Sequence, residues 1–182
     1  MMLRDLERFV TKWLIFMTNR IEKVIIPPDI KLKHWGYGEW VEEADEVIFY
    51  YKDIRCKIIR CHAYETDFSM FGGHLCGYVI VPHNHPWFGK SWDDLSADVH
   101  GGLTYYREEG SDWVIGFDCA HSGDLCPSTE IFKRKYQDNY MDEIIKKFPQ
   151  FKHLFKVTYR NITFVEAECK SLVDQMLECL VK

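Results

Sequence analysis

Histidine and aspartate gather in residues 77–127, in three groups that each adjoin glycine or proline. The groups are residues 82–86, 98–102 and 116–124. Side chains of these two types can bind a metal ion, transfer protons or hydrogen-bond a polar ligand. Five of the eight histidines lie between positions 74 and 121, so the chain concentrates them in one region. We expect one joint polar site there, which either cuts a ligand or only holds it.

The second group combines an acid, an imidazole and two glycines. If this stretch forms a strand, Asp98, His100 and Thr104 share one face, because side chains alternate along a strand. A carboxylate beside a histidine can orient it, raise its basicity or share a divalent ion with it. Gly101 and Gly102 interrupt the strand, and glycine there often marks the close approach of a ligand. We therefore expect His100 to be catalytic or to bind a metal ion.

Acidic side chains surround the single histidine of the third group. Asp118, His121 and Asp124 are three residues apart, so one helical turn would bring their side chains together. Cys119 adjoins Asp118, whose negative charge disfavours a thiolate, and we do not expect it to be a nucleophile. The expected catalytic residues are His100 and His121, as general base and acid, with Asp118. If a divalent metal ion is bound, its expected ligands are Asp98, His100, His121 and Asp124.

The first group opens a long irregular segment, residues 82–97, and such segments are uncommon between strands unless they have a function. His83 and His85 would point to opposite sides of an extended chain, so both reach one ligand only if the backbone turns. We expect His85 to contact the phosphate of a ligand, while His83 is the weaker candidate. The expected ligand-binding residues are His85, Trp87, Gly101, Gly102, Thr104 and Tyr105. Trp87, Tyr105 or Trp113 would stack on a base.

Length and composition predict one intracellular domain. The chain has 182 residues, of which 47% are apolar and 15% aromatic, enough for one sizeable core. Its net charge of −5 argues against broad binding to DNA or RNA, which needs a basic face. The seven cysteines include no CxxC pair, and we recognise neither a signal peptide nor a membrane span. We therefore expect a cytoplasmic protein whose cysteines are reduced.

The hydrophobic pattern predicts an α+β fold, with one antiparallel sheet of about five to six strands packed by N- and C-terminal helices. Residues 1–27 would hold the N-terminal helix, 46–126 the sheet and site loops, and 128–182 the helical C-terminal part. The expected strands are residues 30–35, 47–51, 54–61, 75–81, 98–106 and 113–117.

Local signals refine this outline. We expect Lys52-Asp53 to turn a hairpin and the acidic residues 39–46 to form a solvated loop. In the clearest helix, residues 163–181, Thr163 and Glu166 have the spacing of a capping box. The N-terminal helix, residues 3–23, has a wide apolar face, so a homo-oligomer formed through it is one expectation.

Residues 76–82, 85–86, 99–105 (VHGGLTY), 116–124 (GFDCAHSGD) and 159–175 resemble a family of small uncharacterised proteins of tailed bacteriophages and prophages. The two central motifs carry the resemblance most specifically. It implies a phage protein in the host bacterial cytoplasm. Small phage proteins of this kind often act against host defence, some by degrading nucleotide signals and others by sequestering them.

Two hypotheses from different classes follow. The first is an enzyme that hydrolyses a phosphodiester bond in a host defence nucleotide, with or without a divalent metal ion as cofactor. The second is a non-catalytic sponge or inhibitor that binds the nucleotide signal or a host defence protein. The third alternative is a structural protein of the virion. None of these hypotheses involves binding to DNA or insertion into a membrane.

Overall fold

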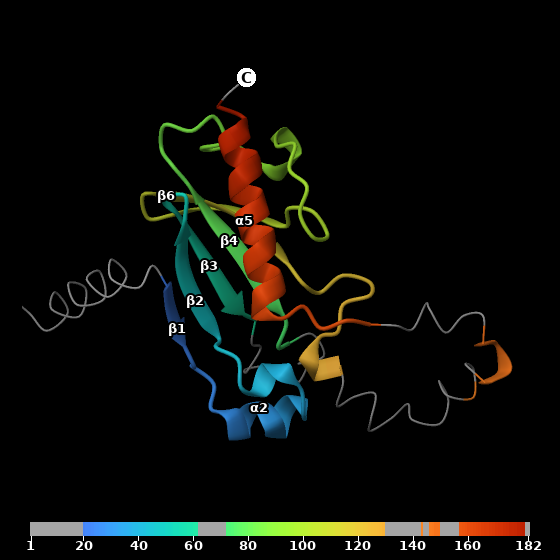
Figure 1. Cartoon of the computed structure of the whole chain (residues 1–182). Helices are drawn as coiled ribbons and strands as arrows, with labels where there is room; N and C mark the ends of the chain where they lie inside the picture. Colours follow the sequence, from blue (N-terminus) through green and yellow to red (C-terminus); the bar gives the residue numbers. More distant parts are fainter. Residues whose placement is uncertain (1–19, 62–71, 130–142, 144–145, 150–156, 181–182) are drawn as a thin grey trace, which may run out of the picture.

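A six-stranded antiparallel sheet carries one long helix across one of its faces (Figure 1). The computed structural model describes residues 20–61, 72–129, 143, 146–149 and 157–180. The strands are β1 (Arg20–Lys23), β2 (Glu46–Tyr51), β3 (Ile54–Arg60), β4 (Leu75–Val81), β5 (Tyr105–Glu109) and β6 (Asp112–Asp118). Their order in the sheet is β1-β2-β3-β4-β6-β5. The expectation of an α+β fold with a C-terminal helix is confirmed.

The expected hairpin joins β2 to β3. Lys52 and Asp53 form its two-residue turn with φ angles of 50° and 63°, the left-handed values that a type I′ turn requires. Tyr51 and Ile54 pair directly across the turn. Arg55 lies on the exposed face of β3, where it forms an ion pair of 2.7 Å with Asp112. The hairpin thus separates a dry face from a wet one, as its alternating sequence predicts.

Helix α5 (Ile162–Glu178) packs mainly over β4 and also contacts β3. Its buried stripe follows the expected helical spacing and consists of Val165, Cys169, Leu172, Val173 and Met176. Gly77 of β4 lets the helix come close, because a Cβ at this position would lie 2.8 Å from the sulfur of Cys169. The helix expected at residues 163–181 is therefore confirmed, with the bounds Ile162–Glu178.

The N-terminal cap of α5 differs from the expected capping box. Asn161 is the cap, and its side chain accepts a hydrogen bond of 3.1 Å from the backbone N–H of Phe164. Glu166 forms ion pairs with Arg20 of β1 and with Lys170 instead of reaching back to the cap. Both Asn and Thr cap helices well. The helix starts at the buried Ile162, one residue before the expected cap Thr163, so the cap is Asn161.

Three other segments correct the sequence prediction. Arg20–Lys23, expected within the N-terminal helix, pairs with β2 as strand β1. Helix α2 (Pro28–Trp35) replaces the strand expected at residues 30–35, because Pro28 suits the first helical turn. β5 starts only at Tyr105, so residues 98–104 form no strand. Residues 1–19 and most of the helix expected at 129–148 lie outside the described residues.

The acidic loop expected to be solvated is the centre of a buried ion network. The fully buried Asp45 accepts a hydrogen bond of 2.8 Å from Arg60 Nε and forms an ion pair of 2.8 Å with Lys31. Glu43 accepts from Arg60 at 3.0 Å and from the hydroxyl of Tyr159 at 2.5 Å. Burial opposes the ionisation of Asp45, but hydrogen bonds from Lys31 and two backbone N–H groups outweigh it and lower its pKa. The network joins the sheet, α2 and the segment that leads into α5.

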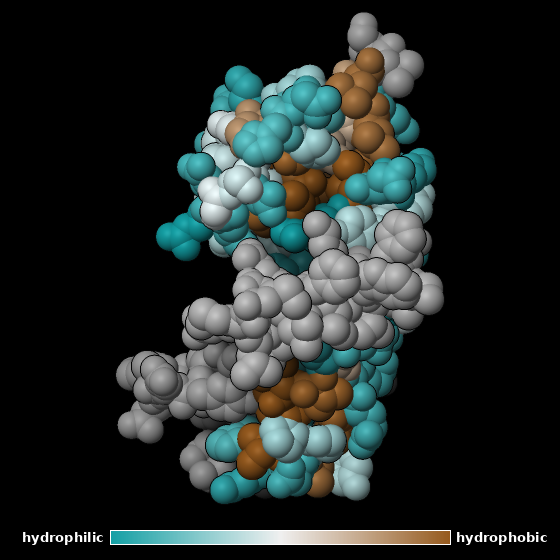
Figure 2. Space-filling model, turned by 90° about the vertical axis from the view of Figure 1, so that its left-hand side faces the viewer, coloured by the Kyte–Doolittle hydropathy of each residue, from teal (hydrophilic) through white to brown (hydrophobic). Residues whose placement is uncertain are grey.

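One view of the surface shows where apolar side chains meet solvent. Figure 2 shows hydrophobic side chains at the level of α2 and near the C-terminal end of α5. The exposed large apolar residues in these parts include Val24, Ile25 and Leu180. Among the helices of the described residues, none combines the length and the apolar character needed to span a membrane.

Candidate functional site

The carboxylate of Asp124 is the centre of the polar cluster, and its side chain is fully buried. One oxygen lies 2.7 Å from His100 Nε2 and accepts from the backbone N–H of His121 at 3.0 Å. The other accepts from Arg160 Nε at 2.9 Å. Burial alone would raise the pKa of Asp124, but these hydrogen bonds outweigh it and lower the pKa. Asp124 is therefore ionised, and its carboxylate links the segments that carry His100 and His121 to the guanidinium of Arg160.

A short parallel contact brings Arg160 to this carboxylate. Asp124 forms an isolated parallel bridge with Thr158. The backbone N–H of Thr158 donates to the carbonyl of Gly123 at 2.9 Å, and Leu125 N–H donates to Thr158 at 3.0 Å. The chain that enters α5 thus runs beside the loop that follows β6. Arg160 then packs its guanidinium 4.7 Å from the ring centroid of Phe164.

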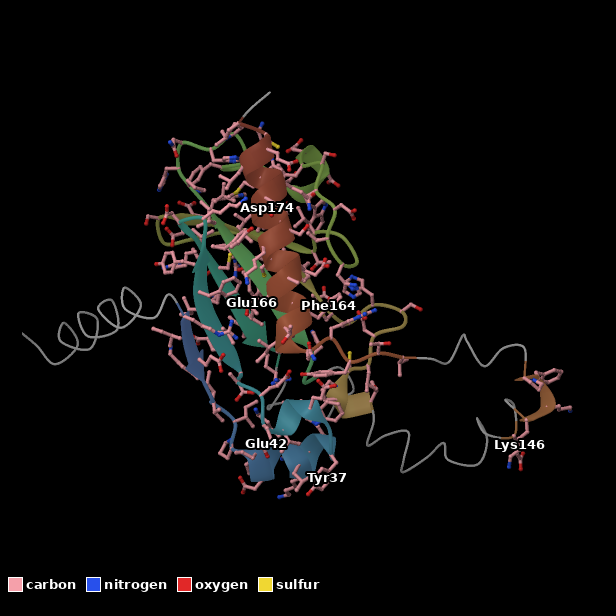
Figure 3. All side chains as sticks on the ribbon, viewed as in Figure 1. Tyr37, Glu42, Lys146, Phe164, Glu166 and Asp174 are labelled. Atoms are coloured by element: carbon pink, nitrogen blue, oxygen red, sulfur yellow. The ribbon has the colours of Figure 1, made fainter. Side chains whose placement is uncertain are left out.

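Aromatic rings and a helix side chain hold His100 in position. Its ring centroid is 5.5 Å from that of His121 and 5.2 Å from that of Phe164, both in edge-to-face geometry. Its backbone N–H donates to Glu168 at 2.7 Å. Phe164 and Glu168 are one turn apart on α5, so the helix holds both the ring and the backbone. Figure 3 shows Phe164 and Glu166 on opposite sides of α5, with Phe164 on the side of this site.

Gly101 is required because the ring of His121 occupies the space where a side chain would be. A Cβ at position 101 would lie 2.1 Å from His121 Cε1, whereas a Cβ at Gly102 would meet nothing within 4 Å. Both glycines have positive φ, 69° and 86°. Gly101 and Gly102 therefore allow a tight turn, and Gly101 also leaves space for the ring of His121.

Substituting each glycine by alanine separates these two effects. Both Gly101→Ala and Gly102→Ala incur the cost of a left-handed alanine, about 1–2 kcal/mol. Only Gly101→Ala must displace the His121 ring, which adds about 1–3 kcal/mol of overpacking. Urea unfolding measures the difference, and the His121 ring resonances should shift only in Gly101→Ala. Equal losses of stability and unshifted resonances in both variants would contradict this role.

His121 keeps one ring nitrogen without a hydrogen bond. Its Nδ1 is buried and has no hydrogen-bond partner among the described residues. It lies 3.8 Å from an oxygen of Asp118 and 3.7 Å from an oxygen of Asp124. Two carboxylates thus flank an imidazole that can exchange a proton with a ligand after a small movement of the ring.

Three of the four expected metal ligands come together. One nitrogen each of His100 and His121 and one oxygen of Asp124 lie within 4.8 Å of one another. Imidazole and carboxylate are donors that suit a zinc ion. Arg160 is already paired with the carboxylate, however, and its positive charge repels a second cation. The donor set fits a metal ion in type, and Arg160 already balances the charge of its one carboxylate.

Asp98, the fourth expected ligand, is placed elsewhere. Its backbone N–H and carbonyl form hydrogen bonds of 2.7 and 2.8 Å with the side chain of Gln175, and the residue is exposed. Asp98 and His100 do not share a strand face as expected, because residues 98–104 form no strand and the backbone turns at Gly101. Asp124, reached through the fold, is the partner of His100.

His85 and Trp87 also belong to the core and not to a ligand site. His85 Nε2 lies 2.9 Å from the carbonyl of Met176, and its Nδ1 accepts from the backbone N–H of Trp87 at 3.1 Å. Both ring nitrogens are therefore used, and His85 is only 5% exposed. The Trp87 ring is 6% exposed and packs in the main core. The prediction that they contact a ligand is corrected: the loop folds back on α5.

Thr104 and Tyr105, two of the expected ligand-binding residues, line a cavity of about 340 Å³ beside the cluster. Its lining residues are His74, Cys76, Tyr78, Thr104, Tyr105, Phe117, Asp118 and Ala120. Asp118 joins the cavity to the cluster, since one of its oxygens lies 3.8 Å from His121 Nδ1. The expectation that Cys119 is not a nucleophile agrees with its environment, because burial raises the pKa of its thiol.

Sequence reasoning missed four residues of this region: His74, Arg160, Phe164 and Glu168. The last three come from the chain entering α5 or from α5 itself. The helix pattern marks its stripe as core but gives no signal for the side chains at its margins. Arg160, Phe164 and Glu168 all lie within residues 159–175, one of the segments that carried the family resemblance. His74 is one of the five histidines between positions 74 and 121.

No protein family model matches the chain, no curated protein matches it, and no solved structure matches it. The class of site, two histidines and an arginine around one buried aspartate beside a cavity, follows from geometry alone.

Proposed function

We propose that the protein hydrolyses a phosphodiester bond in a small nucleotide, with His100 as general base and His121 as general acid. The observation that carries the proposal is the convergence of His100, His121 and Arg160 on Asp124. Two imidazoles at this spacing can act on opposite sides of one phosphorus atom, and a guanidinium suits its negative charge.

Asp124 sets the role of His100. Because a carboxylate accepts hydrogen bonds, the short contact of 2.7 Å places a proton on His100 Nε2. In the neutral ring Nδ1 is then the basic nitrogen, as in other sites where an aspartate orients a catalytic histidine. His100 Nδ1 takes the proton of the attacking water, whose oxygen forms the new bond to phosphorus.

His121 and Arg160 complete the reaction. His121 donates a proton to the leaving oxygen as the phosphorus–oxygen bond to it breaks, and Asp118 and Asp124 orient its ring. Arg160 uses Nε for Asp124, and within the described residues its two terminal nitrogens form no hydrogen bond. Those nitrogens are placed to contact the oxygens of the phosphate, where charge develops in the transition state.

The biological setting of the proposal comes from the resemblance of the two central motifs to phage proteins. A phage protein in the host cytoplasm that cleaves nucleotides would remove a host defence signal. The acidic net charge of −5 argues against a long nucleic acid, which needs a basic face, and so supports a small ligand.

A second candidate function is a sponge that binds the nucleotide without cutting it. It is favoured by the rigid environment of His100, whose ring is held between two other rings and whose Nε2 is bonded to a buried carboxylate. A site that only binds needs such a preformed surface and no proton transfer.

Incubation with cyclic dinucleotides, cyclic trinucleotides and ADP-ribose derivatives separates the two candidates. We expect products by chromatography, with the rate unchanged by EDTA because Arg160 supplies the positive charge. His121→Ala should lower the rate by about 10²–10⁴-fold. His34→Ala, at an exposed histidine of α2, is the control and should not. Release of intact ligand on heating the complex would instead establish the sponge, and a rate abolished by EDTA would establish a metal enzyme.

A further inference from the structure

A row across three strands shapes the floor of the cavity beside the His–Asp cluster. In this row Tyr78 of β4 pairs with Gly116 of β6, which pairs with Tyr105 of β5. The two tyrosine rings meet edge-to-face over the glycine, with centroids 5.2 Å apart. A Cβ at Gly116 would lie 2.6 Å from the Tyr78 ring, so glycine is needed for this arrangement. The row offers two aromatic surfaces to a flat ligand.

The next row supplies the polar groups. Asp118 pairs with Cys76 at the end of β6, and one of its oxygens accepts from the backbone N–H of Ala120 at 3.0 Å. His74 precedes β4 and is 8% exposed, and its buried Nδ1 has no hydrogen-bond partner among the described residues. A buried nitrogen without a hydrogen-bond partner is rare, and a bound ligand or ion would supply that partner. Burial lowers the pKa of His74, so its ring is neutral at pH 7.

We propose that this cavity binds the nucleobase of the substrate and selects bases that carry an amino group. The Asp118 carboxylate only accepts hydrogen bonds, so it pairs with an exocyclic amino group and leaves a keto oxygen unpaired. The neutral His74 bonds a ring nitrogen as donor or acceptor, and the tyrosine rings pack on the base. The inference rests on the proposed function, since an oxygen of Asp118 lies 3.8 Å from Nδ1 of His121, the imidazole that acts on the phosphate.

Matched nucleosides test the selection without any reaction. Guanosine and inosine differ only in the 2-amino group, and cytidine carries an amino group where uridine has a keto oxygen. Titration calorimetry on the whole chain should give an affinity about tenfold or more higher for guanosine over inosine or for cytidine over uridine. Equal affinities within both pairs, or no binding of any nucleoside, would overturn the inference.

Three variants locate the selection. Asp118→Asn should bring the preferred pair to near-equal affinity, because the amide can face a keto oxygen. Tyr105→Ala should weaken the binding of every nucleoside, whereas Tyr106→Ala, whose ring packs against Trp92 outside the cavity, should not. Thermal unfolding confirms that each variant is folded. Unchanged selection in Asp118→Asn counts against the site.

The inference and the proposed function fail in different ways. Selective nucleoside binding without any phosphodiester cleavage would leave the base site standing and remove the enzyme. Cleavage at rates that do not depend on the base would leave the enzyme standing and remove the base site.

Discussion

Asp124→Asn is expected to lower the rate of the proposed phosphodiester hydrolysis by about 10⁴-fold, the largest functional effect that we expect from any single change in this site. The amide keeps the shape of the side chain but turns one acceptor oxygen into a donor. His100 Nε2–H then faces a donor or loses its partner, so the ring adopts the other tautomer and its basic nitrogen turns away from the ligand. The variant also loses a charged partner of Arg160, which costs about 1.5–3 kcal/mol of stability.

Asp98→Asn is the matched control, because Asp98 is an aspartate two residues from His100 that contacts Gln175 only through its backbone. Its stability should change by less than about 0.5 kcal/mol and its rate should stay the same. Single-turnover rates and urea unfolding measure both quantities. If Asp124→Asn kept a tenth of the wild-type rate, Asp124 would not determine the tautomer of His100.

Asp45→Ala is expected to cause the largest loss of stability, about 3–5 kcal/mol, because it leaves the buried charges of Arg60 and Lys31 without their shared counterion. Asp112→Ala removes a carboxylate from an exposed ion pair with Arg55 and should cost less than about 1 kcal/mol. Chemical denaturation of the two variants beside the wild type measures the contrast. Equal small losses would mean that the buried network adds nothing to stability.

The same network predicts how stability depends on pH. The pKa of Asp45 in the folded chain lies below its ordinary value of 3.8. The stabilisation is therefore complete above the unfolded pKa and is lost as the pH falls through the folded pKa. Between pH 5 and pH 3 the free energy of unfolding should fall more steeply in the wild type than in Asp45→Ala. Parallel curves for the two proteins would contradict the assignment.

Local sequence patterns predict much of the fold, because neighbouring residues largely determine where a strand, a turn or a helix forms. The alternation in β2 and β3, the left-handed turn at Lys52-Asp53 and the apolar stripe of α5 are each set by neighbouring residues. The expectation for residues 39–46 failed because acidic side chains usually face water. The predicted hairpin does place Arg60 opposite Asp45, one step beyond the pair Glu46–Ile59. Its sequence gives no sign, however, that both side chains would be buried.

The sequence predicted which types of residue form the candidate site, but only some of the contacts between them. His100, His121, Asp118 and Asp124 do converge, since glycines and short turns place them near strand ends. Asp98 was preferred as the partner of His100 because it is near in sequence, whereas the fold supplies an aspartate 24 residues further on. His85 shows the opposite case, in which a histidine beside prolines satisfies the end of a helix and not a ligand.

The parallel contact between Asp124 and the segment before α5 has a consequence for the order of synthesis. Tyr159 enters the buried ion network, and the next residue, Arg160, enters the site. A nascent chain that has emerged only as far as residue 130 holds all six strands but neither of these side chains. The polar cluster around Asp124 is therefore complete only after residues 158–168 have been synthesised, which is later than every strand of the sheet.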